Sequence, residues 1–146
     1  MPRGEFPRTI VDTNVLFSAV GRSMGNPARV VASVFPTEAA LVSPALLDEY
    51  RLVLRRPAAV RFHGRTDEAI DRLLGTVEEL SQLVAPAAGP ACPDPTDQHR
   101  WDLLAGVPEA VLVTGERLLL SSGHFPGRIL SPREFVERYL GEPGQP

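Results

Sequence analysis

Short apolar runs alternate with stretches of helical periodicity along this chain, and this alternation restricts the possible folds more than any other feature. The clearest runs are residues 8–11, 39–43, 110–114 and 128–130, and a helical pattern follows each of them. Runs of this length and composition favour buried strands. Because no hairpin signal joins two consecutive runs, the strands need crossover connections. The sequence therefore predicts an α/β fold with a parallel sheet and helices on both of its faces.

Cap-and-proline pairs mark the beginnings of several predicted helices. Asn26-Pro27 and Ser43-Pro44 each place a capping residue before a proline at the first helical position. The helix after Ser43 is expected to end at Pro57. Ser131-Pro132-Arg133-Glu134 has the pattern of a capping box for a final helix. Residues 84–96, rich in Pro, Ala and Gly, are expected to cross the molecule as a linker within the same domain.

Length and composition are typical of one globular domain. The chain has 146 residues, of which 43% are hydrophobic and 23% charged, enough to build a sizeable core. We expect a single domain over residues 1–146 with an ordered core of about 8–141. No apolar run approaches the ~20 residues that cross a bilayer, and the N-terminus lacks the apolar core of a signal peptide. A cytoplasmic protein without membrane contact is therefore expected.

Cysteine and basic residues add little chemistry. The single Cys92 cannot form an internal disulfide and is expected to be a buried or incidental thiol, not a reactive one. The three histidines have no metal-ligand spacing with one another or with Cys92. The net charge of −3 argues against an overall electrostatic grip on nucleic acid. Five arginines between residues 51 and 65 indicate a solvated face, with a nucleic-acid or partner surface as the second interpretation.

Asp12 is the residue that the apolar pattern explains least. It follows the run that ends at Val11, where a helical pattern begins. An ionised carboxylate beside a buried strand is costly unless it is paired, hydrogen-bonded or bound to a cation. Ligands of open α/β sheets bind outside the carboxyl ends of strands, which is the predicted place of Asp12. The alternative is that Asp12 or Thr13 only caps the following helix. Asp12 alone leaves both interpretations open.

Three further acidic residues are placed so that they could meet Asp12. Glu116 also follows a strand run, and Glu49 lies at the border of an apolar helical face. Asp97 begins a helix one turn before Trp101, which we expect in the core. Strand ends and the first turns of the following helices gather at one rim of a parallel sheet. Carboxylates gathered there repel one another unless a hard divalent cation such as Mg²⁺ or Mn²⁺ neutralises them, and such sites hydrolyse phosphodiesters.

The order and spacing of five motifs are together more specific than any one of them. They are Val11-Asp12-Thr13-Asn14-Val15-Leu16, then Ser43-Pro44 with Leu47-Asp48-Glu49-Tyr50, then Cys92-Pro93-Asp94-Pro95-Thr96-Asp97, then Val113-Thr114-Gly115-Glu116, and finally Ser131-Pro132-Arg133-Glu134-Phe135. From Ile10 to about Leu140 the chain thus resembles the PIN domain family, in particular the VapC-like ribonucleases that are toxins of toxin–antitoxin pairs.

This resemblance implies a three-layer α/β/α fold with a central parallel sheet of four or five strands. It implies an acidic pocket that binds Mg²⁺ or Mn²⁺ and an endonuclease acting on single-stranded RNA. It also implies a homodimer blocked by a cognate antitoxin protein. By position, Asp12, Glu49 and Asp97 match the family's first three acids, with Asp94 a less favoured alternative to Asp97. Asn14 and Thr114 match polar residues that line the same pocket.

One motif departs from the family pattern. The family usually has Thr-Gly-Asp where this chain has Thr114-Gly115-Glu116. We expect Asp12, Glu49, Asp97 and Glu116 to hold the metal, directly or through water. The longer Glu116 keeps a second interpretation open, a PIN-like module with weakened catalysis that binds RNA or protein. A nuclease acting on structured RNA or DNA flaps is a third, disfavoured because the short chain has no inserted arch.

Overall fold

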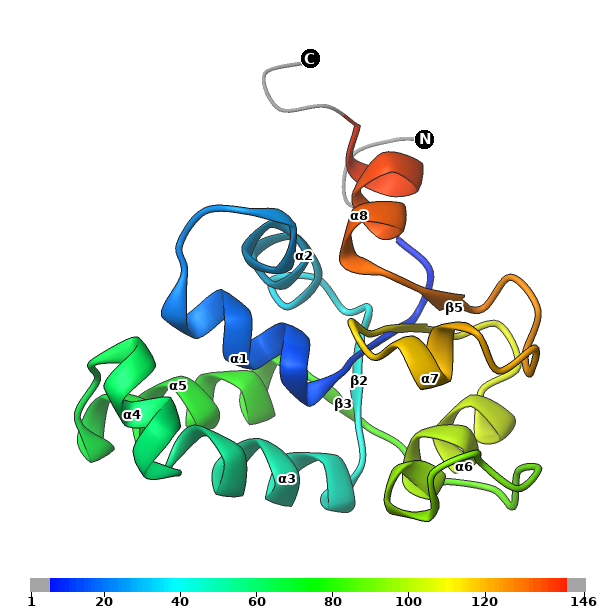
Figure 1. Ribbon diagram of the computed structural model, residues 1–146, viewed down its shortest axis with the longest axis horizontal. Coiled ribbons are helices and arrows are strands. Elements are labelled where there is room, and N and C mark those ends of the chain that lie inside the picture. The colour runs from blue at the N-terminus through cyan, green and yellow to red at the C-terminus, as the bar shows by residue number, and fades with distance from the viewer. Residues whose placement is uncertain (1–5, 142–146) are drawn as a thin grey trace.

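The computed structural model describes residues 6–141 and contains one parallel sheet of five strands (Figure 1). The strand order is β3-β2-β1-β4-β5, and every neighbouring pair is parallel. The strands are β1 (Thr9–Val11), β2 (Ala40–Val42), β3 (Gln82–Leu83), β4 (Val111–Val113) and β5 (Ile129–Leu130). The predicted parallel sheet is confirmed.

Helices flank the sheet and complete the α/β/α arrangement (Figure 1). In chain order they are α1 (Thr13–Gly21), α2 (Asn26–Val34), α3 (Pro44–Leu54), α4 (Pro57–His63), α5 (Asp67–Leu80), the 3₁₀ turn η1 (Pro95–Asp97), α6 (Gln98–Gly106), α7 (Arg117–Leu120), α8 (Pro132–Phe135) and the π-helical continuation η2 (Val136–Leu140). Within residues 6–141, no helix is long and apolar enough to span a bilayer.

Local capping signals explain most of the helix boundaries, with two differences. Ser43 caps α3, and Ser131 forms the predicted capping box with Glu134. The prediction that Asn26 caps α2 is wrong, because Gly25 is the N-cap, at φ 110°, and no side-chain hydrogen bond caps the helix. Pro57 follows the end of α3 as predicted, but it also begins α4, a helix that the sequence did not predict.

The strand order brings the ends of β1 and β4 together. The side chains of β1 and β4 are all buried, and the register pairs Val11 with Val113. The amide of Asp12 continues this pairing with a 2.9 Å hydrogen bond to the carbonyl of Val113. The chain leaves β1 for β2 on one side and reaches β4 on the other, so the strand order reverses here. Such a switch point is where open α/β sheets bind ligands.

Candidate active site

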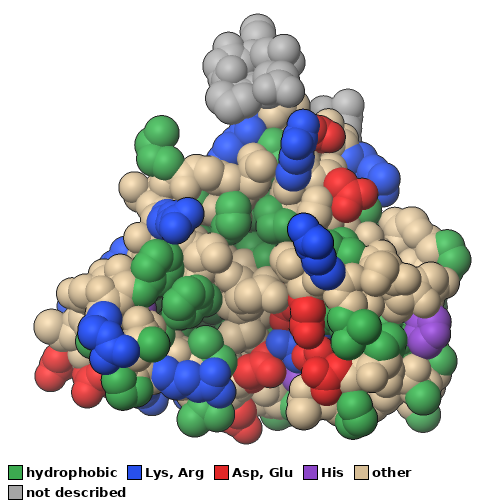
Figure 2. Space-filling model, viewed as in Figure 1, with side chains coloured by type: hydrophobic (Ala, Val, Ile, Leu, Met, Phe, Trp, Pro, Cys, Tyr) green, Lys and Arg blue, Asp and Glu red, His purple; other side chains and the backbone are tan. Residues whose placement is uncertain are grey.

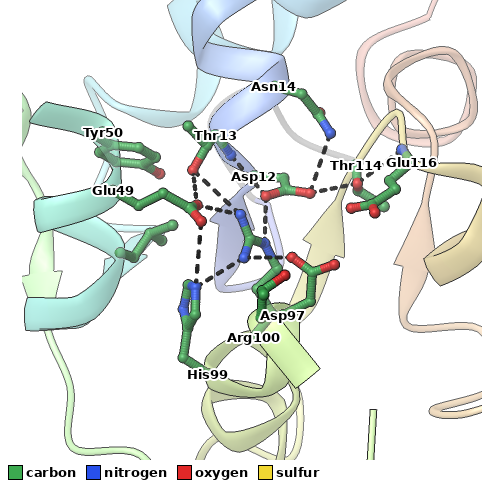
Figure 3. A network of polar contacts seen from close by, with 12 residues as sticks. Asp12, Thr13, Asn14, Glu49, Tyr50, Asp97, His99, Arg100, Thr114 and Glu116 are labelled. Carbon is green, nitrogen blue, oxygen red and sulfur yellow. Dashed lines mark hydrogen bonds and ion pairs between the residues drawn. The ribbon is translucent and has the colours of Figure 1, made fainter. Parts of the chain in front are cut away.

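Asp12 is buried at the carboxyl end of β1, and donors surround its carboxylate (Figure 3). Oδ1 accepts hydrogen bonds from the Thr13 amide at 2.8 Å and from Nε of Arg100 at 2.5 Å. Oδ2 accepts hydrogen bonds from the hydroxyl of Thr114 at 2.5 Å and from the side-chain amide of Asn14 at 3.4 Å. Asp12 therefore caps α1 and also belongs to a polar network, so both interpretations of the sequence describe part of its role.

Arg100 lies at the centre of this network, although no sequence motif predicted it. Its side chain is only 4% exposed, and it forms ion pairs with Asp12, with Asp97 at 2.9 Å and with Glu49. Burial lowers the pKa of Arg100, but the charges of Asp12 and Glu49 outweigh burial and raise it above its ordinary value. One buried guanidinium thus stays charged and holds three acidic side chains together (Figure 3).

Glu49 reaches the network from α3 and is partly exposed, as expected for a residue at the border of an apolar face. Its Oε2 accepts hydrogen bonds from Thr13 and Arg100, and Nε2 of His99 lies 3.7 Å from Oε1. Burial raises the pKa of Glu49, but the hydrogen bonds of His99 and Thr13 and the charge of Arg100 outweigh this and lower it to about 2. Glu49 is therefore ionised throughout the physiological pH range.

A second group of carboxylates lies on the other side of Asp97. Asp94, Asp97 and Glu116 each offer a ligand atom within 4.8 Å of the others. Burial, followed by the charges of Asp97 and Asp12, raises the pKa of Glu116 to about 7. Burial and the charges of Asp12 and Asp94 also raise the pKa of Asp97, against the effect of Arg100. Hydrogen bonds from Thr96 instead lower the pKa of Asp94. Burial is thus the main cause of the raised pKa values, and neighbouring negative charges add to it.

This group fits a hard divalent cation by the chemistry of its donors. Carboxylate oxygens are the ligands that Mg²⁺ and Mn²⁺ prefer, and the three side chains come from two segments, with Asp94 and Asp97 at η1 and Glu116 at the start of α7. The extra methylene of Glu116 does not remove its carboxylate from the group. Oδ2 of Asp12 points toward the same side, where Thr114 and Asn14 hold it (Figure 3).

The predicted site residues are thus divided between two neighbouring groups. Asp12, Glu49 and Asp97 meet on Arg100, whereas Asp97 and Glu116 meet with Asp94. Asn14 and Thr114 contact Asp12 directly. Asp94, which the sequence analysis ranked behind Asp97, lies beside it. The sequence marks Arg100 only by its position three residues after Asp97, a spacing that exposed helical ion pairs share.

A cavity of about 430 Å³ opens beside the network, between α1, α3 and α4. Its apolar wall includes Phe17, Val53 and the alanines of α4. Its polar lining includes Thr13, Asn14, Glu49, Arg56 and Arg100. The cavity therefore combines an apolar surface with charged groups. It lies next to the part of the network that Glu49 and Arg100 form.

Acidic side chains gather in the lower middle of the face shown in Figure 2, while most arginines of this face lie around them. In the arginine run of residues 51–65, Arg51 pairs with Glu78 at 2.9 Å and Arg55 pairs with Asp71. Both arginines are more than a third exposed, as expected for a solvated face. Arg56 differs from them because it lines the cavity.

Comparisons with known proteins agree with this geometry. The chain is 22% identical over 143 residues to the uncharacterized protein MJ1680 of Methanocaldococcus jannaschii, covering 90% of this chain and 91% of that protein. No solved structure matches the chain significantly. A family model described as PIN domain matches residues 8–118, which include Asp12, Glu49, Asp97 and Glu116. The chain therefore belongs to the PIN domain family.

Proposed function

We propose that this protein is a Mg²⁺- or Mn²⁺-dependent endoribonuclease that cuts single-stranded RNA. The observation that carries the proposal is the group formed by Asp94, Asp97 and Glu116, whose ligand atoms lie within 4.8 Å of one another. The group lies at the carboxyl edge of the sheet, where α/β proteins bind their ligands. Membership of the PIN domain family, whose proteins are generally metal-dependent nucleases, supports the same chemistry.

Each residue has a distinct role in this proposal. Asp97 and Glu116 hold the cation with Asp94, and Asp12 acts on it directly or through water. Glu49 contributes through Arg100, which it holds in the network. When bound, the cation supplies Lewis-acid activation of water and of the scissile phosphate. Thr114 and Asn14 fix the orientation of the Asp12 carboxylate through their hydrogen bonds to Oδ2.

The cavity supports a single-stranded substrate. A volume of about 430 Å³ is sufficient for one unpaired nucleotide, and Asn14, which contacts Asp12, also lines the cavity. Phe17 offers an aromatic wall for a base, and Arg56 offers a cation for a neighbouring phosphate. In duplex RNA the bases are paired and stacked, and a single nucleotide would have to leave the helix to enter.

The test is a cleavage assay on purified protein with single-stranded RNA and Mn²⁺ or Mg²⁺. We expect the wild type to cleave RNA and the variants Asp12→Asn and Glu116→Gln to lose cleavage. EDTA should abolish cleavage by the wild type. Duplex RNA and flap DNA of the same sequence serve as comparison substrates and should be cut much more slowly. Circular dichroism checks that each variant is folded. Equal cleavage by all proteins would identify a contaminating nuclease and remove the proposal.

We also propose that the protein is the toxin of a toxin–antitoxin pair and acts as a cytoplasmic homodimer. The resemblance of its motifs to VapC-like ribonucleases supports this role. A small reading frame beside the gene should then encode a protein that forms a complex with this chain and blocks RNA cleavage. Light scattering after size exclusion would measure the dimer. If the product of that reading frame neither binds nor inhibits the chain, it is not an antitoxin.

A second candidate is a PIN-like module that binds RNA or protein without cutting. The observation that favours it is Arg100, which forms ion pairs with Asp12, Glu49 and Asp97 and so holds them together without a metal. The ion pairs of this network come from the chain itself. Calorimetry separates the two candidates, because RNA binding without any binding of divalent ions would support the module over the enzyme.

A further inference from the structure

Arg100 fills the space between three carboxylates that come from separate parts of the chain. Asp12 follows β1, Glu49 belongs to α3 and Asp97 ends η1. In the sequence, these three acidic residues lie 88, 51 and 3 positions from Arg100. The guanidinium is 4% exposed, so water does not screen these ion pairs strongly.

The hydrogen bonds of Arg100 use most of its donor capacity. A guanidinium has five N–H groups on three nitrogens. Nε contacts Asp12, Nη1 contacts Asp97 at 2.9 Å and Nε2 of His99 at 2.8 Å, and Nη2 contacts Glu49 and, at 3.3 Å, the hydroxyl of Thr13. Four of the five donors thus have oxygen acceptors within the chain, and the fifth faces the ring of His99. Arg100 is therefore built into the network by its contacts with three carboxylates and one hydroxyl.

A divalent ion that joined Asp12, Glu49 and Asp97 would have to occupy the position of the guanidinium. Among residues 6–141, no ion pair joins Asp94 or Glu116 to a basic side chain, since the ion pairs of Arg100 reach Asp97 but neither of these two. The two sides of Asp97 therefore differ in what neutralises them. One side carries its own positive charge, and the other can accept one from solution.

We propose that Arg100 is a positioning residue that replaces a second divalent ion, so that each chain binds one ion, on the side of Asp94, Asp97 and Glu116. The inference rests on the proposed metal-dependent function and fixes the metal count of its site. Arg100 holds Asp12, Glu49 and Asp97 in place before the ion arrives. Replacing Arg100 with an uncharged side chain opens the position between the three carboxylates to a second ion.

The experiment is calorimetric titration of Mn²⁺ into metal-free protein, with the stoichiometry as the readout. We expect one Mn²⁺ per chain for the wild type and for Arg100→Lys, which keeps a positive charge, and two for Arg100→Met. The control is Arg128→Met, because Arg128 hydrogen-bonds the carbonyls of Leu104, Val107 and Ala110 at 2.6 to 2.8 Å, away from the acids. Arg128→Met should lose stability but keep one ion.

The outcomes separate this inference from the proposed function. Two ions on the wild type, together with RNA cleavage, would overturn the role of Arg100 and leave the nuclease intact. A folded Arg100→Met that binds one ion, or an Arg100→Lys that binds two, would overturn it as well. The wild-type and lysine measurements decide the question if Arg100→Met does not fold. A wild type that binds no ion and cuts no RNA would remove both proposals.

Discussion

The hydroxyl of Thr114 lies 2.5 Å from Oδ2 of Asp12 and donates a hydrogen bond to it, which links the ends of the adjacent strands β4 and β1. The hydroxyl oxygen of Thr114 in turn accepts a hydrogen bond from the backbone amide of Glu116 at 3.1 Å. One buried threonine therefore orients the outer oxygen of the first acid and the backbone that leads to the last. Its removal should affect stability and activity together.

Thr114→Val should lower the free energy of unfolding by about 1.5–3 kcal/mol, the range for a lost hydrogen bond to a charged group. Thr9→Val is the matched control, because Thr9 is also buried in the sheet but donates to the neutral carbonyl of Pro7 at 2.6 Å. Its loss should be about 0.5–1.5 kcal/mol, with RNA cleavage unchanged. Urea denaturation measures both variants, and equal losses would contradict the special role of Thr114.

Stability should depend on pH through Glu116. Its pKa is about 7 in the folded protein against an ordinary 4.5, so the folded state binds more protons than the unfolded state between these values. In EDTA, the free energy of unfolding should therefore fall as the pH rises from 4.5 to 7. Glu116→Gln should flatten this part of the curve. The assignment would be wrong if wild type and variant had the same slope in urea denaturation.

Glu49 should make stability depend on pH in the opposite direction, and at lower pH values. Its folded pKa of about 2 lies below the ordinary 4.5, so the unfolded state binds more protons between these values. Stability should therefore be lost as the pH falls from 4.5 to 2, and less so in Glu49→Gln. Glu79→Gln, at an exposed position of α5, is the control. The same acid denaturation midpoint in Glu49→Gln and the control would contradict the shift.

Divalent ions should stabilise the folded protein by mass action. At a concentration 100 times the dissociation constant, Mg²⁺ or Mn²⁺ should add about 2.7 kcal/mol to the free energy of unfolding. Asp94→Asn and Glu116→Gln should lose most of this gain, whereas Glu79→Gln should keep it. Thermal denaturation with and without EDTA provides the measurement. An equal metal-dependent shift in all four proteins would place the ion elsewhere.

The cavity should determine RNA affinity independently of the acids. Arg56→Gln should weaken binding of single-stranded RNA and reduce the slope of log affinity against log salt by about 0.7, the value for one phosphate contact. Ala58→Trp should weaken binding by filling the cavity that Ala58 lines. Arg61→Gln is the control, because Arg61 does not line the cavity. Fluorescence anisotropy measures all three, and an unchanged affinity in Ala58→Trp would exclude the cavity as the nucleotide site.

The sheet was predictable because its strands are short apolar runs separated by helical patterns. Residues 9–11, 40–42 and 111–113 follow from local composition alone. The helix α4 was missed because Pro57 signals both the end of one helix and the start of the next. The acidic residues at the strand ends were also predictable as site residues, because an ionised carboxylate next to a buried apolar run is costly unless it is paired or bound to a cation.

Arg100 could not be found in the same way. Two of its three acidic partners lie 88 and 51 residues away, and only the folded chain brings them to it. In the sequence, an arginine three residues after an aspartate is indistinguishable from an exposed helical ion pair. Local sequence patterns could therefore indicate the acidic residues. The role of the Arg100 guanidinium depends on long-range contacts and could not be predicted in this way.

Phe17 of α1 and Phe62 of α4 stack with their ring centroids 4.9 Å apart, and a Cβ atom on Gly21 would lie 1.9 Å from the Phe62 ring. Phe17 lines the cavity, so the packing of its aromatic wall depends on a glycine one helical turn away. Any larger residue at position 21 would displace the Phe62 ring from this stack. Such a substitution would alter the cavity wall and leave the acidic network in place.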